Sequence, residues 1–311
     1  MNRMPIWMDC DTGTDDAVAI MLAHALPELE IKGISAVCGN AEQEKTYWNT
    51  QRVIGLVGAR YPVYRGAERP LMKPLTTAAH AHGQNGLGGV ELPVPADAAV
   101  PELPAWDALY ECARQYPGEL RLIATAPLTN IAIAFTKHPD LPGLLRDMLV
   151  MGGSAGRGNI TPAAEFNFFV DTHAASVVFR SGVKLTMCGL DVTLQAYLTR
   201  AQLDGFAASG TRVGRFVSEC TRPGRKLVEK FGLPGFSMHD CCPVMFAAHP
   251  ELFGGEMAGV VIETRGDITS GKSVTDLYSD KQFPFKNAFV VLKLDRERFI
   301  SILTERLLSL G

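Results

Sequence analysis

The sequence predicts an α/β fold: a doubly wound, mainly parallel central sheet flanked by helices, with a helical cap from the C-terminal part. Two observations carry this prediction. Up to residue 195, short apolar segments alternate with longer segments of helical periodicity. Beyond residue 195, helical segments follow one another before strand-like segments return. The 311 residues contain no repeat and no long linker, so we expect one domain over 1–311.

The alternating part supplies the core of the predicted sheet. Its strand candidates are short apolar runs at 5–9, 31–38, 120–125, 148–153 and 183–189. The helical patterns between them cover 15–26, 44–58, 106–116, 128–138 and 172–182. The later part predicts helices over 199–209 and 211–231, a third beginning at His239, strands at 259–264 and 288–295, and a last helix from Arg296. We expect the late strands to extend the same sheet at its edge.

The composition limits the kinds of partner and the cellular compartment that we expect for this protein. Hydrophobic residues make up 47% and charged residues 20%, and the net charge of −3 gives no electrostatic preference for nucleic acid. The apolar segment Met4–Met8 is too short for the core of a signal peptide, and no apolar run approaches a membrane span. We therefore expect a cytoplasmic protein with no nucleic-acid or membrane partner. The seven cysteines lack CxxC and Cys/His metal spacing, so we expect buried, reduced side chains.

The first strand candidate leads into DCDTGTDDA, which places four carboxylates within eight residues: Asp9, Asp11, Asp15 and Asp16. Carboxylates this close repel one another and resist burial unless a positive charge neutralises them. Their oxygen atoms suit calcium or magnesium rather than zinc. They follow a strand, and open α/β sheets bind ligands beyond the carboxyl ends of their strands. The segment therefore predicts a cation site, in which we expect Asp9 to orient the turn through hydrogen bonds rather than to ligate.

Other polar groups should gather on the same rim of the sheet. Asn40, Thr125 and Met151 follow or end strand candidates, so the parallel topology places them near the aspartates. A calcium ion needs more oxygen ligands than two carboxylates of the acidic segment can supply, so further ligands must come from elsewhere on the rim. The pair His239-Asp240 offers another carboxylate beside a side chain that can transfer a proton.

A second polar segment is GNITPAAEFN, which holds Asn159, Glu165 and Asn167 in a loop after a strand. Two carboxamides and a carboxylate can accept from and donate to vicinal hydroxyl groups, which points to a sugar ligand. The glycines between 152 and 158 also suggest a phosphate site, but the sequence has no Walker lysine and no GxGxxG after the first strand. We interpret them as turn residues that let the backbone approach the sugar.

Several alternatives stay open at this point. His82 is either a pocket residue or a polar loop residue. An aspartate-nucleophile phosphatase also has DxD after an apolar strand, but it carries threonine or valine at the fifth position, where this chain has Gly13. A calcium-dependent nucleoside or ribose binder without catalysis would need the same sugar contacts but not His239, so the presence of His239 favours a hydrolase.

Seven motifs, in consistent order and spacing, resemble those of the inosine-uridine nucleoside N-ribohydrolases. They are DCDxGxDDA at 9–17, GN at 39–40, HG at 82–83, TAPLTNIA at 125–132, MGG with GNxTPAAEFN within 151–167, GLDVT at 189–193 and HD at 239–240. The resemblance implies hydrolysis of the N-glycosidic bond of ribonucleosides to ribose and free nucleobase, in nucleoside salvage. It also implies a homo-oligomer, either a dimer or a tetramer.

The resemblance further implies the residues of the site. A calcium ion would be held by Asp11, Asp16, Asp240 and the backbone carbonyl of Thr125. The ribose would be held by Asp15, Asn40, Asn159, Glu165 and Asn167, with His82, Met151 and Phe231 as further substrate contacts. Asp11 would act as the base toward a calcium-bound water, and His239 would assist the leaving base.

Two departures from the resemblance concern the metal turn and the base pocket. Thr12 stands where many relatives carry proline, and we expect a looser turn there without loss of a ligand. Some relatives have a tyrosine two or three helical turns before the His-Asp pair, whereas this chain has none between Tyr197 and Tyr278. Phe231 falls close to that position, so the base would meet an apolar face without a hydroxyl group.

Overall fold

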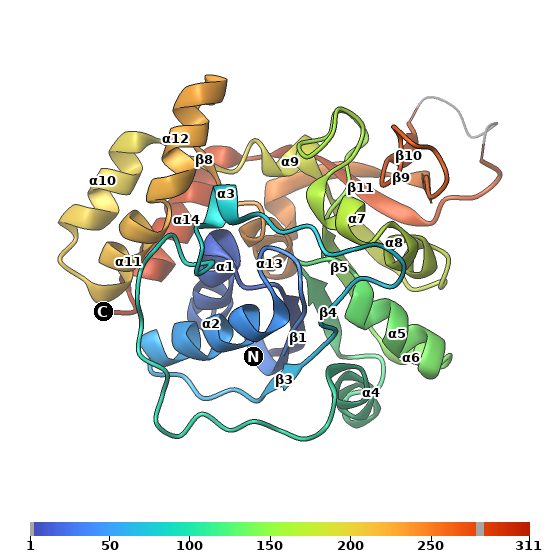
Figure 1. The fold of residues 1–311 in the computed structure, drawn as a ribbon, viewed down its shortest axis with the longest axis horizontal. Coiled ribbons are helices and arrows are strands. Elements are labelled where there is room, and N and C mark those ends of the chain that lie inside the picture. Colours follow the sequence, from blue (N-terminus) through green and yellow to red (C-terminus); the bar gives the residue numbers. More distant parts are fainter. Residues whose placement is uncertain (1–2, 278–282) are drawn as a thin grey trace.

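A nine-stranded sheet forms the centre of the computed structural model, which describes residues 3–277 and 283–311 (Figure 1). The strand order is β10-β9-β11-β6-β5-β4-β1-β2-β3. The strands are β1 Met4–Cys10, β2 Leu29–Ala36, β3 Val63–Arg65, β4 Arg121–Ala124, β5 Asp147–Met151, β6 Leu185–Cys188, β9 Phe253–Ile262, β10 Ser273–Asp276 and β11 Ala288–Leu294. The neighbouring pairs from β3 to β11 are parallel, and only β9 runs antiparallel to its two neighbours. The predicted fold class is confirmed.

The sheet changes direction between β1 and β4. From β1 the chain proceeds through β2 and β3 to one side, and from β4 it proceeds through β5 and β6 to the other. Such a switch point opens a crevice at the carboxyl ends of the two central strands. Here those ends carry Asp9 on β1, Asp11 directly after it and Thr125 directly after β4, and the backbone N–H of Thr125 donates to the carbonyl of Asp9 at 2.9 Å. The topology therefore places the acidic segment at the expected binding edge.

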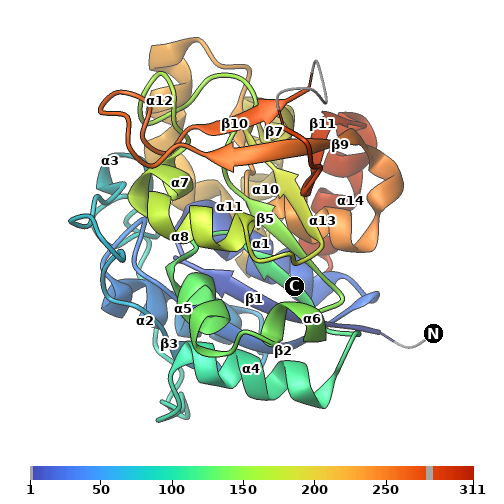
Figure 2. The same ribbon diagram turned by 90° about the vertical axis from the view of Figure 1, so that its right-hand side faces the viewer.

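Helices cover both faces of the sheet because successive strand side chains point to opposite sides. Ile6, Met8 and Cys10 pack with one set of helices, whereas Trp7 packs with the other. The first set includes α1 Thr14–Ala25, α2 Gln43–Leu56, α13 Cys241–Ala248 and α14 Arg296–Leu308. The second set includes α4 Ala105–Gln115, α5 Thr129–Lys137 and α8 Thr172–Phe179, which lie in front of the sheet in Figure 2.

Short elements complete the chain. They are α3 Ala79–His82, α6 Leu141–Leu144, α7 Phe166–Val170, α9 Leu190–Thr193 and the 3-10 helix Pro250–Leu252. A separate ribbon pairs β7 Tyr197–Leu198 with β8 Phe236–Ser237. All seven cysteines are buried and free. Within the described residues, no helix has the length and apolarity that a membrane crossing requires.

The predicted helical cap consists of α10 Arg200–Ala208, α11 Arg212–Cys220 and α12 Arg222–Phe231. The single helix predicted over 211–231 is wrong, because the chain breaks at Thr221. Pro223 lacks the backbone N–H that a continuous helix would need, and its ring would clash with the carbonyl of Glu219. A proline in the first turn of a new helix is tolerated, so α12 begins there instead. The strand predicted at 259–264 is part of the longer β9, which begins at Phe253.

Candidate functional site

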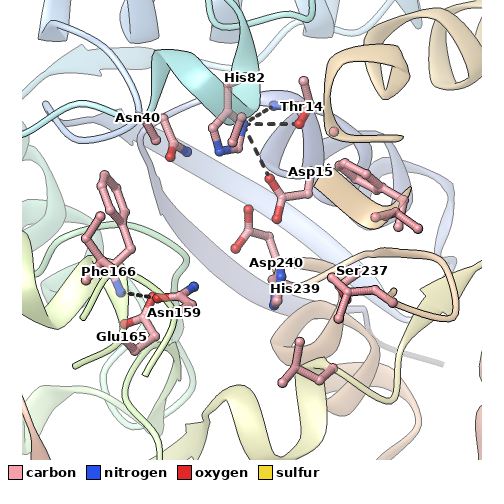
Figure 3. A pocket seen from close by; sticks show the side chains of 18 of the residues that line it. Thr14, Asp15, Asn40, His82, Asn159, Glu165, Phe166, Ser237, His239 and Asp240 are labelled. Carbon is pink, nitrogen blue, oxygen red and sulfur yellow. Dashed lines mark hydrogen bonds and ion pairs between the residues drawn. The ribbon is translucent and has the colours of Figure 1, made fainter. Parts of the chain in front are cut away.

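A cavity of about 400 Å³ lies at the carboxyl edge of the sheet, where residues of α3 and of α12 from the cap also line it (Figure 3). Sheet loops line one part of it, and α12 with the segment before α13 lines another. The predicted site residues in its lining are Asp15, Asn40, His82, Thr125, Met151, Asn159, Glu165, Asn167, Phe231, His239 and Asp240. Asp11 and Asp16 are fully buried next to it. The structure therefore brings together residues from one end of the chain to the other.

Asp15, Asp16 and Asp240 form an aspartate cluster, of which Asp15 and Asp240 line the cavity and Asp16 is buried beside it. One carboxylate oxygen from each of the three lies within 4.8 Å of the others, and all three side chains are buried. Asp16 accepts hydrogen bonds from the Gly13 backbone N–H at 3.0 Å, from Asn40 Nδ2 at 3.1 Å and from Thr125 Oγ1 at 2.8 Å. These donors fix the orientation of Asp16 within the cluster.

Asp11 adds a fourth buried carboxylate. Its Oδ2 accepts the backbone N–H of Asn40 at 2.6 Å, whereas its Oδ1 is buried and has no hydrogen-bond partner among the described residues. A buried carboxylate oxygen without a partner is unfavourable unless something absent from the chain itself compensates it. Asp11 thus has an unused acceptor beside the cluster.

The pKa values of Asp11, Asp16 and Asp240 are raised. Burial raises the pKa of Asp11 and Asp240 well above the ordinary value, and the neighbouring aspartates raise both further. Burial, followed by the charge of Asp15, raises the pKa of Asp16 to about 7. The protein alone thus favours protonated forms here, and a bound cation would reverse that preference by stabilising the carboxylates. The all-oxygen donor set fits a hard divalent cation.

Asp9 has a different environment from the other aspartates. It accepts hydrogen bonds from Ser35 Oγ and, at 2.7 Å, from Asn130 Nδ2. Burial raises the pKa of Asp9 to about 7.

Thr12, in the same turn, is not held loosely: its hydroxyl lies 2.6 Å from that of Thr50 in a buried hydrogen bond.

Side chains of the second polar segment form hydrogen bonds with backbone groups close to them. Glu165 caps the N-terminus of α7, because its carboxylate accepts the N–H groups of Asn167 at 2.9 Å and Phe168 at 3.2 Å, and also that of Gly153 at 2.9 Å. Burial raises the pKa of Glu165 to about 7. The Nδ2 group of Asn167 donates to the carbonyl of Thr125 at 3.0 Å. The loop and the end of β4 are therefore fixed to each other.

The remaining polar atoms of this segment are available to a ligand. Asn159 Oδ1 accepts the Phe166 N–H at 2.9 Å, which leaves its amide nitrogen without a partner among the described residues (Figure 3). Asn167 uses its nitrogen but not its oxygen in hydrogen bonds within that same part of the chain. Both side chains line the cavity. They can offer a donor and an acceptor to hydroxyl groups there.

His82 lies in the cavity, where Figure 3 shows it close to Thr14 and Asp15. Its Nδ1 accepts the backbone N–H of Thr14 at 3.1 Å and is 3.8 Å from Asp15 Oδ1. Burial lowers the pKa of His82. Gly13 permits this approach, because a Cβ at that position would lie 2.5 Å from His82 Nδ1. His82 thus lines the cavity, whereas its place near the nucleobase stays a prediction.

His239 also lines the cavity, next to Asp240 (Figure 3). Its Nδ1 is 2.8 Å from the hydroxyl oxygen of Thr193, and burial lowers its pKa. The wall around it is apolar and includes Leu194, Val228 and Phe236. Phe231 belongs to the rim of this wall rather than to its interior, since 64% of its surface is exposed. No tyrosine lines the cavity within the described part of the chain.

The sequence interpretation missed the residues that hold the predicted ones in place. Ser35 and Asn130 fix Asp9, while Thr14 and Thr193 contact the two histidines. Asn130 and Thr193 lie inside motifs that were identified for other reasons, so the motifs could have drawn attention to them. Their partners are distant in sequence and follow only from the fold.

Comparison with known proteins agrees with this geometry. The profile of the inosine-uridine preferring nucleoside hydrolase family matches residues 6–301. The pyrimidine-specific ribonucleoside hydrolases RihA of Citrobacter koseri and Escherichia coli strain ATCC 8739 are each 39% identical over 310 residues, which covers 98% of this chain and of the relative. A purine-preferring ribonucleoside hydrolase from Gardnerella vaginalis superimposes with a TM-score of 0.92 at 31% identity, covering 98% of both chains.

A plant nucleoside hydrolase also superimposes with a TM-score of 0.92, at 27% identity over 98% of this chain and 99% of the other. The family profile and the full-length relatives agree with each other and with the motifs around the cavity. The chain therefore belongs to the inosine-uridine preferring nucleoside hydrolase family and is an enzyme of the nucleoside hydrolase type.

Proposed function

We propose that this enzyme catalyses the calcium-dependent hydrolysis of ribonucleosides to ribose and free nucleobase. One observation carries the proposal: a buried group of carboxylates, of which Asp11 and Asp15 each have an oxygen without a hydrogen-bond partner among the described residues, lies beside two histidines and an apolar wall at one cavity. Breaking an N-glycosidic bond needs an activated water, a negative environment for the cationic sugar and a donor for the departing base. The cavity offers residues for each task.

Asp11, Asp16, Asp240 and the backbone carbonyl of Thr125 would hold the calcium ion. When bound, calcium supplies a positive charge that makes a nearby water easier to deprotonate. It would also keep the carboxylates ionised against the effect of burial. Asp11 would act as the base, the role that the family resemblance implies, and its Oδ1 has no hydrogen-bond partner among the described residues that would compete for a proton.

Ribose binding would use Asp15 and Asn40 on one side and Asn159, Glu165 and Asn167 on the other. Both groups line the cavity, as does Met151 at the end of β5. The carboxylates would stabilise the positive charge that develops on the sugar ring as the bond breaks. Water attacking from the side of the aspartate cluster would invert the anomeric centre.

The base would lie against the apolar wall, with His239 donating a proton to it and His82 contributing a second polar contact. The RihA relatives are named pyrimidine-specific, and the Gardnerella enzyme is named purine-preferring. The sequence relatives have the higher identity, so we propose a preference for pyrimidine ribonucleosides. An apolar wall can stack on either kind of base, which makes this preference the part of the proposal that needs the most direct test.

The first prediction is the activity itself. Incubation with uridine, cytidine, inosine and adenosine should release ribose, with the highest kcat/KM for the pyrimidine ribonucleosides. Asp11→Asn should lower kcat about 100- to 10,000-fold with little change in KM, because it removes the base and keeps the shape of the site. Binding of nucleosides without any ribose release by the native enzyme would support a binding protein instead. A higher kcat/KM for the purines would contradict only the base preference.

A second prediction concerns the cation. Prolonged treatment with EGTA should abolish activity, and calcium should restore it. Calcium should also raise the Tm of the stripped protein, since at 100-fold above Kd a ligand adds about 2.7 kcal/mol of stability. Asp16→Asn and Asp240→Asn should reduce this rise in Tm, whereas exposed Asp97→Asn should keep it. Full activity in protein free of metal by elemental analysis would disprove the calcium requirement.

Ribose recognition gives a third prediction. If Asp15, Glu165 and Asn167 bind the 2- and 3-hydroxyl groups, then 2-deoxyuridine should be a poor substrate compared with uridine. The missing hydroxyl leaves buried polar groups unpaired, which disfavours the transition state. The measurement is kcat/KM for the two compounds under identical conditions. Equal values would show that these side chains do not bind the hydroxyl groups.

The role of His239 gives a fourth prediction. His239→Ala should slow uridine hydrolysis about 100- to 10,000-fold, which is the usual contribution of a general acid. The same variant should hydrolyse p-nitrophenyl riboside at close to the native rate, because nitrophenolate leaves without a proton. Equal losses with both substrates would mean that the histidine serves the sugar or the metal ligand Asp240.

A further inference from the structure

We propose that Thr193 is a positioning residue for His239: its hydroxyl donates to Nδ1 of the ring, so that the proton of the neutral ring is on Nε2, on the side of the leaving base. This inference rests on the proposed function for its catalytic meaning. Its structural content, the position of the proton on the ring, is independent of that function.

The hydroxyl of Thr193 has a single partner. Thr193 ends α9 and is fully buried. Its backbone N–H donates to the carbonyl of Gly189 at 3.0 Å, and its carbonyl accepts the N–H of Ala196 at 3.2 Å. Among the described residues, its hydroxyl oxygen forms a hydrogen bond only with His239 Nδ1, at 2.8 Å. The proton of this buried hydroxyl therefore has one acceptor, which is that ring nitrogen.

The opposite direction of this hydrogen bond is unfavourable. If His239 Nδ1 carried the proton and donated it, the Thr193 hydroxyl would be a buried donor with no acceptor in the described part of the chain. Nε2 would then carry a lone pair and could not donate a hydrogen bond to the departing base. Donation by Thr193 satisfies both groups at once and fixes the plane of the ring.

The fold holds these two residues together although 46 positions separate them. The β7–β8 ribbon pairs Tyr197 with Ser237, and the Met238 N–H donates to the carbonyl of Ala196 at 2.7 Å. The segment just after Thr193 and the segment just before His239 are thus joined to each other by backbone hydrogen bonds. This pairing holds the two side chains close together.

The ring of His82 also accepts a hydrogen bond at Nδ1, in this case from a backbone group. Its Nδ1 faces the backbone N–H of Thr14, a group that can only donate, so the neutral His82 ring also carries its proton on Nε2. Two histidines of one cavity thus use Nδ1 to accept from the protein and keep an Nε2–H donor. The base end of the cavity is built to donate hydrogen bonds, which suits a leaving group that gains negative charge.

The test compares Thr193→Val, which keeps the shape and removes the hydroxyl, with Thr193→Ser, which keeps the hydroxyl. Thr193→Val should lower kcat for uridine about 10- to 100-fold, a part of the general-acid contribution, with little change in KM. Its rate on p-nitrophenyl riboside should stay within about twofold of the native rate, because that leaving group needs no proton. Thr193→Ser should restore most of the uridine activity. Native uridine kinetics in the valine variant, or equal losses on both substrates, would overturn the proposal.

A second measurement separates this inference from the proposed function. Nitrogen-15 spectra of histidine-labelled protein, with His239 assigned from a His239→Gln spectrum, report which ring nitrogen carries the proton without any substrate. The native protein should show an unprotonated Nδ1 and a protonated Nε2, and Thr193→Val should show a mixture of both tautomers. A protonated Nδ1 in the native neutral ring would overturn the inference even in an active enzyme. The spectra remain decisive if no nucleoside is hydrolysed.

Discussion

The burial of several carboxylates at one edge of the sheet is the constraint on which the rest of the site depends. Asp11, Asp16 and Asp240 are removed from water, and each raises the free energy of the others when ionised. A fold tolerates such a group only if donors and a positive charge compensate it. The switch point between β1 and β4 makes this possible, because backbone N–H groups and side chains from many segments converge there.

The neighbours of the aspartates each hold more than one part of the site. Asn40 donates to Asp11 through its backbone and to Asp16 through its side chain. Thr125 donates its hydroxyl to Asp16, and its carbonyl accepts from Asn167, whose own backbone N–H is bound by Glu165. A displacement at any of these positions would therefore be transmitted both to the aspartate cluster and to the segment that holds Glu165 and Asn167. Such sharing keeps a polar site ordered before its ligands arrive.

The sequence alone predicted the fold class, the rim of polar residues and the separation of sheet from cap, because these follow from periodicity and from parallel topology. The break at Thr221 was missed, since the effect of Pro223 on the preceding turn was outweighed by a continuous apolar pattern. The contact between Thr193 and His239 could not be predicted from spacing, because it depends on how a two-residue ribbon aligns two distant segments. Local patterns identify which residues carry chemistry, and only the fold shows which of them meet.

The two ends of the cavity come from different parts of the chain, and this has an evolutionary consequence. The end of the cavity that we propose for the sugar and the cation is made mostly by loops of the central sheet, whereas the end proposed for the base is made by α3, α12 and the segments beside β7 and β8. Substitutions in the cap can therefore change which base fits while the groups that break the bond stay as they are. A family can diversify its substrates in this way without rebuilding its chemistry, and the pyrimidine-specific and purine-preferring names of relatives that match almost the full chain agree with such a history.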